Sequence, residues 1–343
     1  MAPIRIRRWN SFSATNASPV EAKLACVTLN KQAPLPASWQ DVFTNNNALV
    51  QTFGVNNLNQ LTNATRAGTL TVAGLASEPL GGYTSWGSPV GVTNVTVSGT
   101  GLTTGNADLY ADGSWAKTNA TLADGNNSYS ATAKDTYNRS ASDSVTVNLP
   151  ATNTFSYDGN GNLTNDGSRV FEYDFENQLT NVYVASAWRS AFQYDAFGRR
   201  RIRREYTWQS SAWVQTNEVR YVYDGMVVEQ ERDANNLALV SYTRGNDLSG
   251  KLQGAGGIGG LLARTDNGQL IAGNAAAHAY YHCDGNGNIT KLLNTNGSVV
   301  ARYAYDPYGN LLGMSGPLAE ANTYRFSSKE WSANAGLYYY GFR

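Results

Sequence analysis

The sequence predicts an all-β protein made of short antiparallel hairpins, and three observations lead to this fold class. The 343 residues include 34 glycines and 21 tyrosines but 9 prolines, a composition that suits pleated strands joined by tight turns. An aromatic residue followed by aspartate, and then by Gly or Asn, recurs along the chain. Between these units apolar and polar side chains alternate, as they do in a strand with one buried face.

The aromatic-Asp units mark the turns of the expected hairpins. Aspartate can bond its own backbone in a turn, and Gly or Asn tolerates the positive φ that many turns need. The clearest units are Tyr157-Asp158-Gly159-Asn160, Tyr194-Asp195-Ala196-Phe197-Gly198, Tyr223-Asp224-Gly225 and Tyr305-Asp306-Pro307-Tyr308-Gly309. Related units occur at Tyr173-Asp174 and at Cys283-Asp284-Gly285-Asn286. Each unit therefore predicts a strand, a turn and a second strand.

An internal repeat connects two distant parts of the chain. The segment Asn59-Gln60-Leu61-Thr62-Asn63 recurs as Asn177-Gln178-Leu179-Thr180-Asn181. A single hairpin cannot bury its own apolar face, so we expect successive hairpins to extend a common sheet.

The stretch between the two copies of this repeat has a different pattern. From residue 69 to residue 150 the aromatic-Asp units give way to short strands rich in Thr and Val. Their spacing predicts an inserted immunoglobulin-like β-sandwich that lacks the Cys-Trp-Cys signature of antibody domains. The expected domains are 1–68 with one degenerate repeat, 69–150 with the sandwich, and 151–343 with the repeat core.

Three segments carry a resemblance to a known family. The first runs from Tyr157-Asp158-Gly159-Asn160 into Tyr173-Asp174-Phe175-Glu176, and it looks like two consecutive repeats. The second is Tyr303-Ala304-Tyr305-Asp306-Pro307, and the third runs from Arg325-Phe326-Ser327-Ser328-Lys329-Glu330 to Gly336-Leu337-Tyr338-Tyr339-Tyr340. From Phe155 to Arg343 the chain thus resembles the Rhs/YD-repeat family, specifically its repeat-associated core region.

The resemblance implies a shell built from hairpins. YD-repeat hairpins would form a curved or spiralling sheet, here a partial shell, and family members enclose a variable C-terminal effector polypeptide that is often a toxin. Such proteins are secreted or attached to the cell surface, although no signal peptide is visible here. The family core ends in an aspartate-dependent self-cleavage segment, and we expect this chain to stop before it. Autoproteolysis and toxin activity are therefore not carried over.

The resemblance and the turn chemistry together give a set of structural repeat residues. They comprise the tyrosines and aspartates of the turns, one turn glycine, and three tyrosines of the closing end. They are Tyr157, Asp158, Tyr173, Asp174, Tyr194, Asp195, Tyr305, Asp306, Gly309, Tyr338, Tyr339 and Tyr340.

Charge and cysteine content exclude several classes of protein. The 26 basic and 26 acidic side chains cancel, which argues against a nucleic-acid partner or a polybasic membrane binder. The sequence contains no apolar run long enough to predict a membrane span. Cys26 and Cys283 are far apart in sequence, so neither a disulfide-stapled mini-domain nor a structural zinc module is expected.

Three motifs invite a chemical role, and each has a simpler interpretation. Gly254-Ala255-Gly256-Gly257-Ile258-Gly259 fits the dinucleotide pattern but lacks the surrounding strand, helix and acid, so a Gly-rich turn is favoured. His278 and His282 would lie about 13 Å apart in a strand, which disfavours a metal site with Cys283. The basic run from Arg199 to Arg204 is expected to form a solvated or ion-paired strand.

We therefore predict a structural scaffold that is not an enzyme and has no catalytic, cofactor-binding or metal-binding residues. Its partner would be the C-terminal effector polypeptide or the rest of the shell. The alternative is a cell-surface adhesin whose sandwich binds glycans through Trp86, Tyr110 or Trp115. A partial shell also leaves a strand edge unpaired, which predicts association of the isolated chain.

Overall fold

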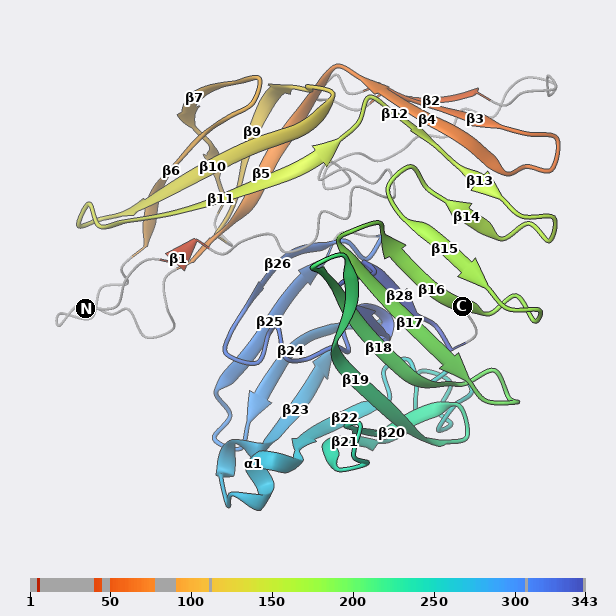
Figure 1. Cartoon of the computed structure of the whole chain (residues 1–343). Helices are drawn as coiled ribbons and strands as arrows, with labels where there is room; N and C mark the ends of the chain where they lie inside the picture. The colour runs from red at the N-terminus through yellow and green to blue at the C-terminus, as the bar shows by residue number, and fades with distance from the viewer. Residues whose placement is uncertain are drawn as a thin grey trace. The chain divides into compact units, whose positions relative to one another are not determined.

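The computed structural model describes residues 5–6, 40–44, 50–77, 91–110, 113–305 and 308–341. The described chain is nearly all β and consists of antiparallel sheets, which confirms the predicted fold class (Figure 1). It divides into two compact units, and the first comprises Met1–Ser156 with Tyr305–Gly313. The second comprises Tyr157–Ala304 with Met314–Arg343. The predicted domain boundaries stay a prediction.

The first unit contains a two-sheet sandwich. One sheet has the order β1-β5-β9-β8, and the other has the order β11-β10-β6-β7. The strands are β1 (Arg5–Ile6), β5 (Thr69–Ser77), β6 (Val92–Gly99), β7 (Leu102–Asn106), β8 (Asp108–Leu109), β9 (Ser114–Thr121), β10 (Gly125–Asp135) and β11 (Ser140–Leu149). Val95 and Val97 of one sheet pack with Leu70 and Trp115 of the other in a single buried core. Alternating Val, Ala and Thr residues supply this core, because every second side chain of a strand faces the same side.

A smaller sheet in the same unit contains the N-terminal copy of the internal repeat. Its order is β12-β4-β3-β2, with β2 (Gln40–Thr44), β3 (Val50–Val55), β4 (Leu61–Ala67) and β12 (Thr152–Thr154). All sandwich strands except β1 lie in sequence between β4 and β12, which pair with each other through Thr65 and Thr152. The sandwich is therefore inserted between two neighbouring strands of this sheet.

Among the described residues the main sheet has fourteen strands in unbroken chain order from β13 to β26, and most of it belongs to the second unit. The strands are β13 (Ser156–Tyr157), β14 (Leu163–Asn165), β15 (Val170–Tyr173), β16 (Leu179–Val184), β17 (Trp188–Tyr194), β18 (Arg200–Gln209), β19 (Ala212–Asp224), β20 (Val227–Arg232), β21 (Ala238–Arg244), β22 (Leu261–Asp266), β23 (His278–Cys283), β24 (Ile289–Asn294), β25 (Val299–Tyr305) and β26 (Leu311–Ser315). Successive hairpins thus extend one sheet, so their turns alternate between its two edges.

Residues 316–341, which we call the closing segment, pack against strands that are far apart in sheet order. The backbone N–H of Ile289 in β24 donates to the carbonyl of Arg325 at 3.0 Å. Glu330 forms an ion pair with Arg200 of β18. Six strand spacings would separate β18 and β24 by roughly 29 Å in a flat sheet. The main sheet must therefore curl around the closing segment (Figure 1).

The closing segment has little regular structure of its own. It contains η3 (Phe326–Ser328) and the short pair β27 (Glu330–Ser332) and β28 (Leu337–Tyr339). Its Ala335 joins Phe171, Val182 and Phe192 of the main sheet in a buried apolar cluster. Burial of these side chains fixes the segment in place.

Helices are short in the described chain. The helix α1 (Asn267–Ile271) and the turn η2 (Ala275–Ala277) connect β22 with β23. Asp266 caps α1 by accepting a hydrogen bond from the N–H of Gln269 at 2.9 Å. None of the helices in the described part has the length and apolar character that a bilayer crossing requires.

Candidate functional site

The aspartates of the aromatic-Asp units cap their own turns. Oδ1 of Asp158 accepts hydrogen bonds from the backbone N–H groups of Asn160 at 2.9 Å and Asn162 at 2.8 Å. Asp174 and Asp195 accept the same two bonds from the residues two and four positions further on. In each turn the fourth residue has a positive φ, and these residues are Gly161, Asn177 and Gly198. The recurring order of Asp followed by Gly or Asn therefore reflects turn geometry.

The internal repeat has the same conformation in both copies. Asn56 replaces the aspartate and accepts from the N–H groups of Leu58 at 2.9 Å and Gln60 at 3.0 Å. Asn59 takes a φ of 59°, close to the 61° of Asn177 in the second copy. The repeated sequence thus encodes one turn together with the first residues of the strand that follows it.

The tyrosine before the turn joins neighbouring strands. The phenol of Tyr194 donates to the carbonyl of Leu179, the first residue of β16, at 2.8 Å. The phenol of Tyr223 donates to the carbonyl of Arg200, the first residue of β18, also at 2.8 Å. Burial raises the pKa of both phenols, so they stay protonated donors. Each tyrosine extends the pairing of two strands beyond their last backbone pair.

The remaining predicted repeat residues lie at strand ends, in turns or in the closing segment. Tyr157, Tyr173 and Tyr305 end β13, β15 and β25, and Gly309 is a buried turn residue with a φ of 88°. Asp306 lies outside the described residues. Tyr338 packs against Trp331 with ring centroids 4.8 Å apart. The ring centroid of Tyr340 lies 5.7 Å from Nζ of Lys329. A functional role for these residues stays a prediction.

Side chains also connect successive turns along one edge of the main sheet. Nδ2 of Asn162 donates to Oδ1 of Asn177 at 2.7 Å and links the first two turns. Arg199 donates to the carbonyl of Gly225 at 2.8 Å and links the turn after β17 with the turn after β19. Gln253 then donates to the carbonyl of Asp224 at 3.0 Å. This edge is therefore held by side chains where the backbone ladder has ended.

The Gly-rich segment that Gln253 begins is organised by a buried aspartate. Asp247 accepts hydrogen bonds from the Ser249 hydroxyl at 2.6 Å and from the N–H groups of Ala255 and Gly257 at 2.6 and 3.1 Å. Burial alone would raise the pKa of Asp247, but these hydrogen bonds outweigh it and lower the pKa to about 2. The structure places Gly254 to Gly259 in consecutive turns before β22, as the sequence predicted.

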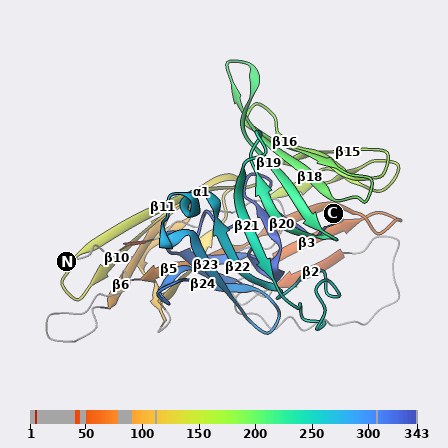
Figure 2. The same ribbon diagram turned by 90° about the horizontal axis from the view of Figure 1, so that it is seen from below.

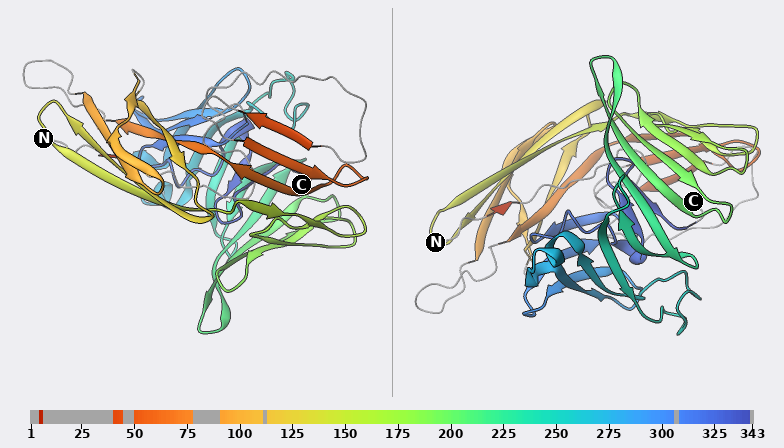
Figure 3. Two further views of the ribbon diagram at one scale, coloured as in Figure 1. Left: turned by 90° about the horizontal axis from the view of Figure 1, so that it is seen from above. Right: turned by 60° about the horizontal axis from the view of Figure 1, so that its bottom comes forward.

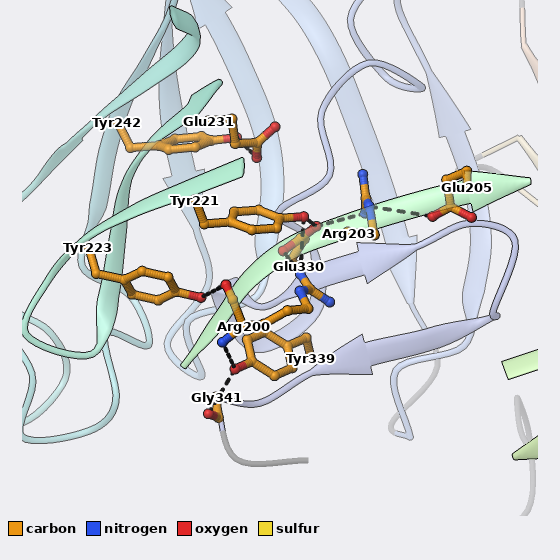
Figure 4. Close-up of polar contacts among 10 residues, drawn as sticks. All are labelled: Arg200, Arg203, Glu205, Tyr221, Tyr223, Glu231, Tyr242, Glu330, Tyr339 and Gly341. Carbon is orange, nitrogen blue, oxygen red and sulfur yellow. Dashed lines mark hydrogen bonds and ion pairs between the residues drawn. The ribbon is translucent and has the colours of Figure 1, made fainter. Parts of the chain in front are cut away.

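A buried cluster of charged and phenolic groups lies where the closing segment meets β18 and β19 (Figure 4). Glu330 pairs with Arg200 and with Arg203, the latter at 2.8 Å. Its Oε1 also accepts a hydrogen bond from the phenol of Tyr221 at 2.7 Å. Tyr339 accepts from the backbone N–H of Arg200 at 3.0 Å. We call Arg200, Arg203, Tyr221, Glu330 and Tyr339 the Glu330 cluster.

The electrostatics of this cluster favour the ion pairs. Burial would lower the pKa of Arg200, but Glu330 and the nearby tyrosines raise it above its ordinary value. The pKa of Arg203 is raised in the same way, by Tyr221 and then Glu330. Nearby Glu231 differs, because burial and then Glu330 raise its pKa. The Tyr242 phenol donates to Glu231 at 2.7 Å. The ion pairs of the Glu330 cluster can hold the closing segment in the curved sheet.

Most of this cluster is not predicted by the sequence. Tyr339 was expected at the closing end, and Arg200 and Arg203 were expected in an ion-paired or solvated strand. The pairing with Glu330 was not expected, because 130 residues separate it from Arg200. Alternation alone would place Arg200 and Arg203 on opposite faces of β18, yet both are buried, because the pairing with β17 skips the exposed Arg201 as in a β-bulge. The ion pairs of this run agree with the expected ion-paired strand.

The histidines and aromatic residues named from the sequence do not converge on one site. His278 begins β23 and shares a 3.0 Å hydrogen bond with Thr265, and Cys283 at the other end of the strand is exposed. Among the described residues, no three His, Cys, Asp or Glu side chains are grouped to hold a metal ion.

The aromatic side chains considered for glycan binding are placed differently from one another. Trp115 is 5% exposed and belongs to the sandwich core, so its expected presentation to a glycan is wrong. A Cβ on Gly74 would lie 2.4 Å from the Trp115 ring, which shows how closely the neighbouring strand covers it. Tyr110 is 47% exposed, and Trp86 lies outside the described residues. Glycan binding itself stays a prediction.

The geometry defines an all-β repeat protein whose hairpins are closed by Asp or Asn and joined by Tyr. No protein-family model matches the chain. It is similar to the tRNA3(Ser)-specific nuclease WapA of Bacillus spizizenii, with 30% identity over 189 residues, which is 54% of this chain and 7% of that protein. The tRNA nuclease WapA of Bacillus subtilis is 29% identical over 190 residues, with the same coverage of 54% and 7%. The chain thus spans a small part of these relatives' length.

Two solved structures resemble the chain more distantly. The crystal structure of TcdB2-TccC3 covers 86% of this chain with a TM-score of 0.39 and 14% identity, and the match spans 14% of that structure's chain. The structure of TcdB2-TccC3-TEV gives the same TM-score of 0.39 with 15% identity, over 86% of this chain and 13% of that one.

One prediction from the sequence is contradicted by the relatives. The chain was predicted not to be an enzyme, because no catalytic constellation was recognised in it. Both WapA proteins are named tRNA nucleases, at 29–30% identity over about half of the chain. These names overturn that prediction, and the activity that they state is that of the whole relatives, of which this chain spans 7%. The physical reason is that a fold does not determine an activity, so a search of the sequence for known catalytic constellations cannot exclude one.

Proposed function

We propose that this chain is the YD-repeat shell portion of a secreted or surface-attached Rhs-type toxin whose activity is cleavage of tRNA. The observation that carries the proposal is the curvature of the main sheet, which brings β18 and β24 against the same closing segment. A curved sheet of hairpins is the wall that such a shell requires.

The chemistry of the repeats supports the same role. Asp158, Asp174 and Asp195 close turns with their own backbone, and Tyr194 and Tyr223 join adjacent strands. These bonds depend on neighbouring hairpins alone, so a wall of this type can be extended by repetition. The similarity to two tRNA nucleases supports the assignment of the activity to the longer polypeptide.

In this proposal the Glu330 cluster has a mechanical role. Glu330 joins the closing segment to Arg200 and Arg203, which are successive inward-facing charges of β18. Loss of these ion pairs would leave the buried guanidinium of Arg200 without a counter-charge and that of Arg203 with Glu205 alone, at a high cost in free energy. The closing segment would therefore keep the curved sheet in one shape around an enclosed effector.

The test uses the complete natural polypeptide, with its own flanking regions, and the Glu330→Gln variant of it. We expect the intact protein to protect its nuclease part from trypsin, and the variant to expose it. We also expect tRNA to be cleaved at defined positions by the nuclease part once it is released. Trypsin cleavage of the nuclease part in the intact protein would refute the shell, and equal protection in the two proteins would refute the role of Glu330. Uncleaved tRNA in every preparation would refute the nuclease.

A further inference from the structure

The hairpin formed by β18 and β19 extends beyond its neighbours in the main sheet (Figures 2 and 3). On one side, β17 pairs with β18 as far as Thr207. On the other side, β20 pairs with β19 from Arg220 to Asp224 only. The eight residues from Ala212 to Val219 therefore have β18 as their one strand partner in the described part of the chain. This part of β19 is a strand edge.

The turn geometry shows which backbone groups point away from β18. Ser210 and Ser211, with φ of 47° and 64°, form a two-residue turn closed by the pair Gln209 and Ala212. In an antiparallel pair every second residue directs its N–H and C=O outward. Trp213 and Gln215 are therefore the residues whose backbone groups face the open side of β19. The N–H of Trp208 also turns outward, and it donates to Ala187 at 2.9 Å.

Aromatic contacts keep this edge rigid. Trp208 and Trp213 lie opposite each other in an edge-to-face arrangement with ring centroids 4.9 Å apart. The guanidinium of Arg189 lies 4.2 Å from the Tyr206 ring centroid and 5.3 Å from that of Trp213. Such contacts stabilise a hairpin whose β19 side has no further strand beside it. A partner strand would thus meet an edge that is already ordered, which reduces the entropy cost of pairing.

The edge lacks the features that protect free strands from pairing. Residues 209–217 contain no charged residue and no proline, whereas exposed edges are usually blocked by such residues. The side chain of Val214 is 42% exposed. Glu218, at the base of the edge, is neutralised by Arg204 at 2.6 Å and Arg220 at 2.8 Å. A second strand can therefore approach without meeting an unpaired charge.

We propose that this edge pairs with the same edge of a second copy of the chain, antiparallel and about a two-fold axis at Val214. In this register Trp213 faces Gln215 of the partner subunit, so that the outward N–H and C=O groups of both edges are satisfied. Val214 faces Val214 of the partner subunit, and both apolar side chains are buried. Because the chain has a formal net charge of zero, two copies do not repel each other through their overall charge.

The self-pairing follows from the chemistry of the edge, not from the proposed toxin function. An isologous contact places each surface against itself, so an uncharged, regularly alternating edge is complementary to its own copy. The contact area of one strand pair is small, and we expect a weak dimer with a dissociation constant on the order of 100 μM.

Disulfide trapping tests the register directly. In the full chain carrying Cys26→Ser and Cys283→Ser, Val214→Cys places two thiols across the two-fold axis, where a disulfide can form. The matched control is Ala212→Cys, because its thiols would lie about 13 Å or more apart along the strands. We expect oxidation to convert the Val214→Cys chain to a covalent dimer at least about tenfold faster than the control. Equal rates, or no dimer, would overturn the proposal.

A second measurement separates this edge from other modes of association. Gln215→Pro removes one outward N–H but leaves the bonds between β18 and β19 intact, whereas Gln215→Thr keeps that N–H. In sedimentation equilibrium we expect the wild-type chain and Gln215→Thr to dimerise, and Gln215→Pro to weaken dimerisation about tenfold or more. Dimerisation that persists in Gln215→Pro would place the contact elsewhere and refute the proposal.

Discussion

The phenol of Tyr221 donates a 2.7 Å hydrogen bond to the carboxylate of Glu330, although 109 positions separate the two residues. The same carboxylate forms ion pairs with Arg200 and Arg203. One side chain of the closing segment thus satisfies three buried groups of β18 and β19. Because a buried charge without a partner is costly, the position of this carboxylate determines where the closing segment can lie.

Replacement of Glu330 tests this dependence. Glu330→Gln keeps the volume of the side chain but leaves the buried Arg200 without a counter-charge and Arg203 with Glu205 alone, at 3.4 Å. We expect a loss of about 3–5 kcal/mol in the free energy of unfolding of the second unit. Urea unfolding gives that free energy, and hydrogen exchange in β18 and β27 locates the loss. Glu176→Gln, in an exposed turn, is the matched control and should leave both measurements unchanged. Equal stabilities of the two variants would show that the ion pairs contribute little.

Two glycines in equivalent turns should respond differently to alanine. Gly287 and Gly297 both occupy the fourth position of a capped turn, with φ of 77° and 75°. A Cβ on Gly287 would lie 2.5 Å from Cγ2 of Ile258 and 2.8 Å from N of Gly259, whereas a Cβ on Gly297 has nothing within 4 Å. We expect Gly297→Ala to cost about 1 kcal/mol from backbone strain alone, and Gly287→Ala to cost clearly more.

Thermal unfolding of the two variants measures this difference. Both alanine variants carry the same backbone penalty. The difference between their melting temperatures therefore reports the packing of the Gly-rich segment on the turn after β23. Equal melting temperatures would mean that the segment moves away from that turn at no cost.

The sequence predicted the turns because their chemistry is local. Asp158 and Asn162 are four residues apart, and the side chain of one meets the backbone of the other in any hairpin of this type. The exposure of Trp115 could not be derived in the same way, because it depends on Gly74 in a strand that is distant in sequence. Pairs such as Tyr221 with Glu330 depend on the curvature of the sheet, which accumulates over many strands and has no signal at a single position.

Acid should loosen the Gly-rich segment through Asp247. Its pKa is lowered to about 2 from an ordinary 3.8 because hydrogen bonds to the carboxylate outweigh the effect of burial. A lowered pKa in the folded state gives stability that is complete above the ordinary value and is lost as the pH falls through about 2. Hydrogen exchange at Ala255 and Gly257 should therefore accelerate between about pH 4 and about pH 2. In Asp247→Asn that pH dependence should be absent, and an unchanged profile would exclude Asp247 as its cause.

Glu231 should have the opposite effect on stability. Burial, and then the charge of Glu330, raise its pKa above the ordinary 4.5. A raised pKa means that the folded state holds the proton more tightly than the unfolded state. The resulting stabilisation is complete below the ordinary pKa and is lost as the pH rises through the folded-state pKa. The second unit is therefore expected to melt at a lower temperature as the pH rises.

Glu231→Gln should remove this dependence. The amide oxygen can still accept the hydrogen bond that the Tyr242 phenol gives to Glu231 at 2.7 Å, and the variant has no charge to bury. We expect the variant to melt at a higher temperature than the wild-type chain at neutral pH, with a smaller difference in acid. Calorimetric melting from about pH 5 to about pH 8 measures both curves. If the melting temperatures of the two proteins changed with pH in parallel, the prediction would be wrong. Only the wild-type chain has a carboxyl group at position 231 whose ionisation opposes folding.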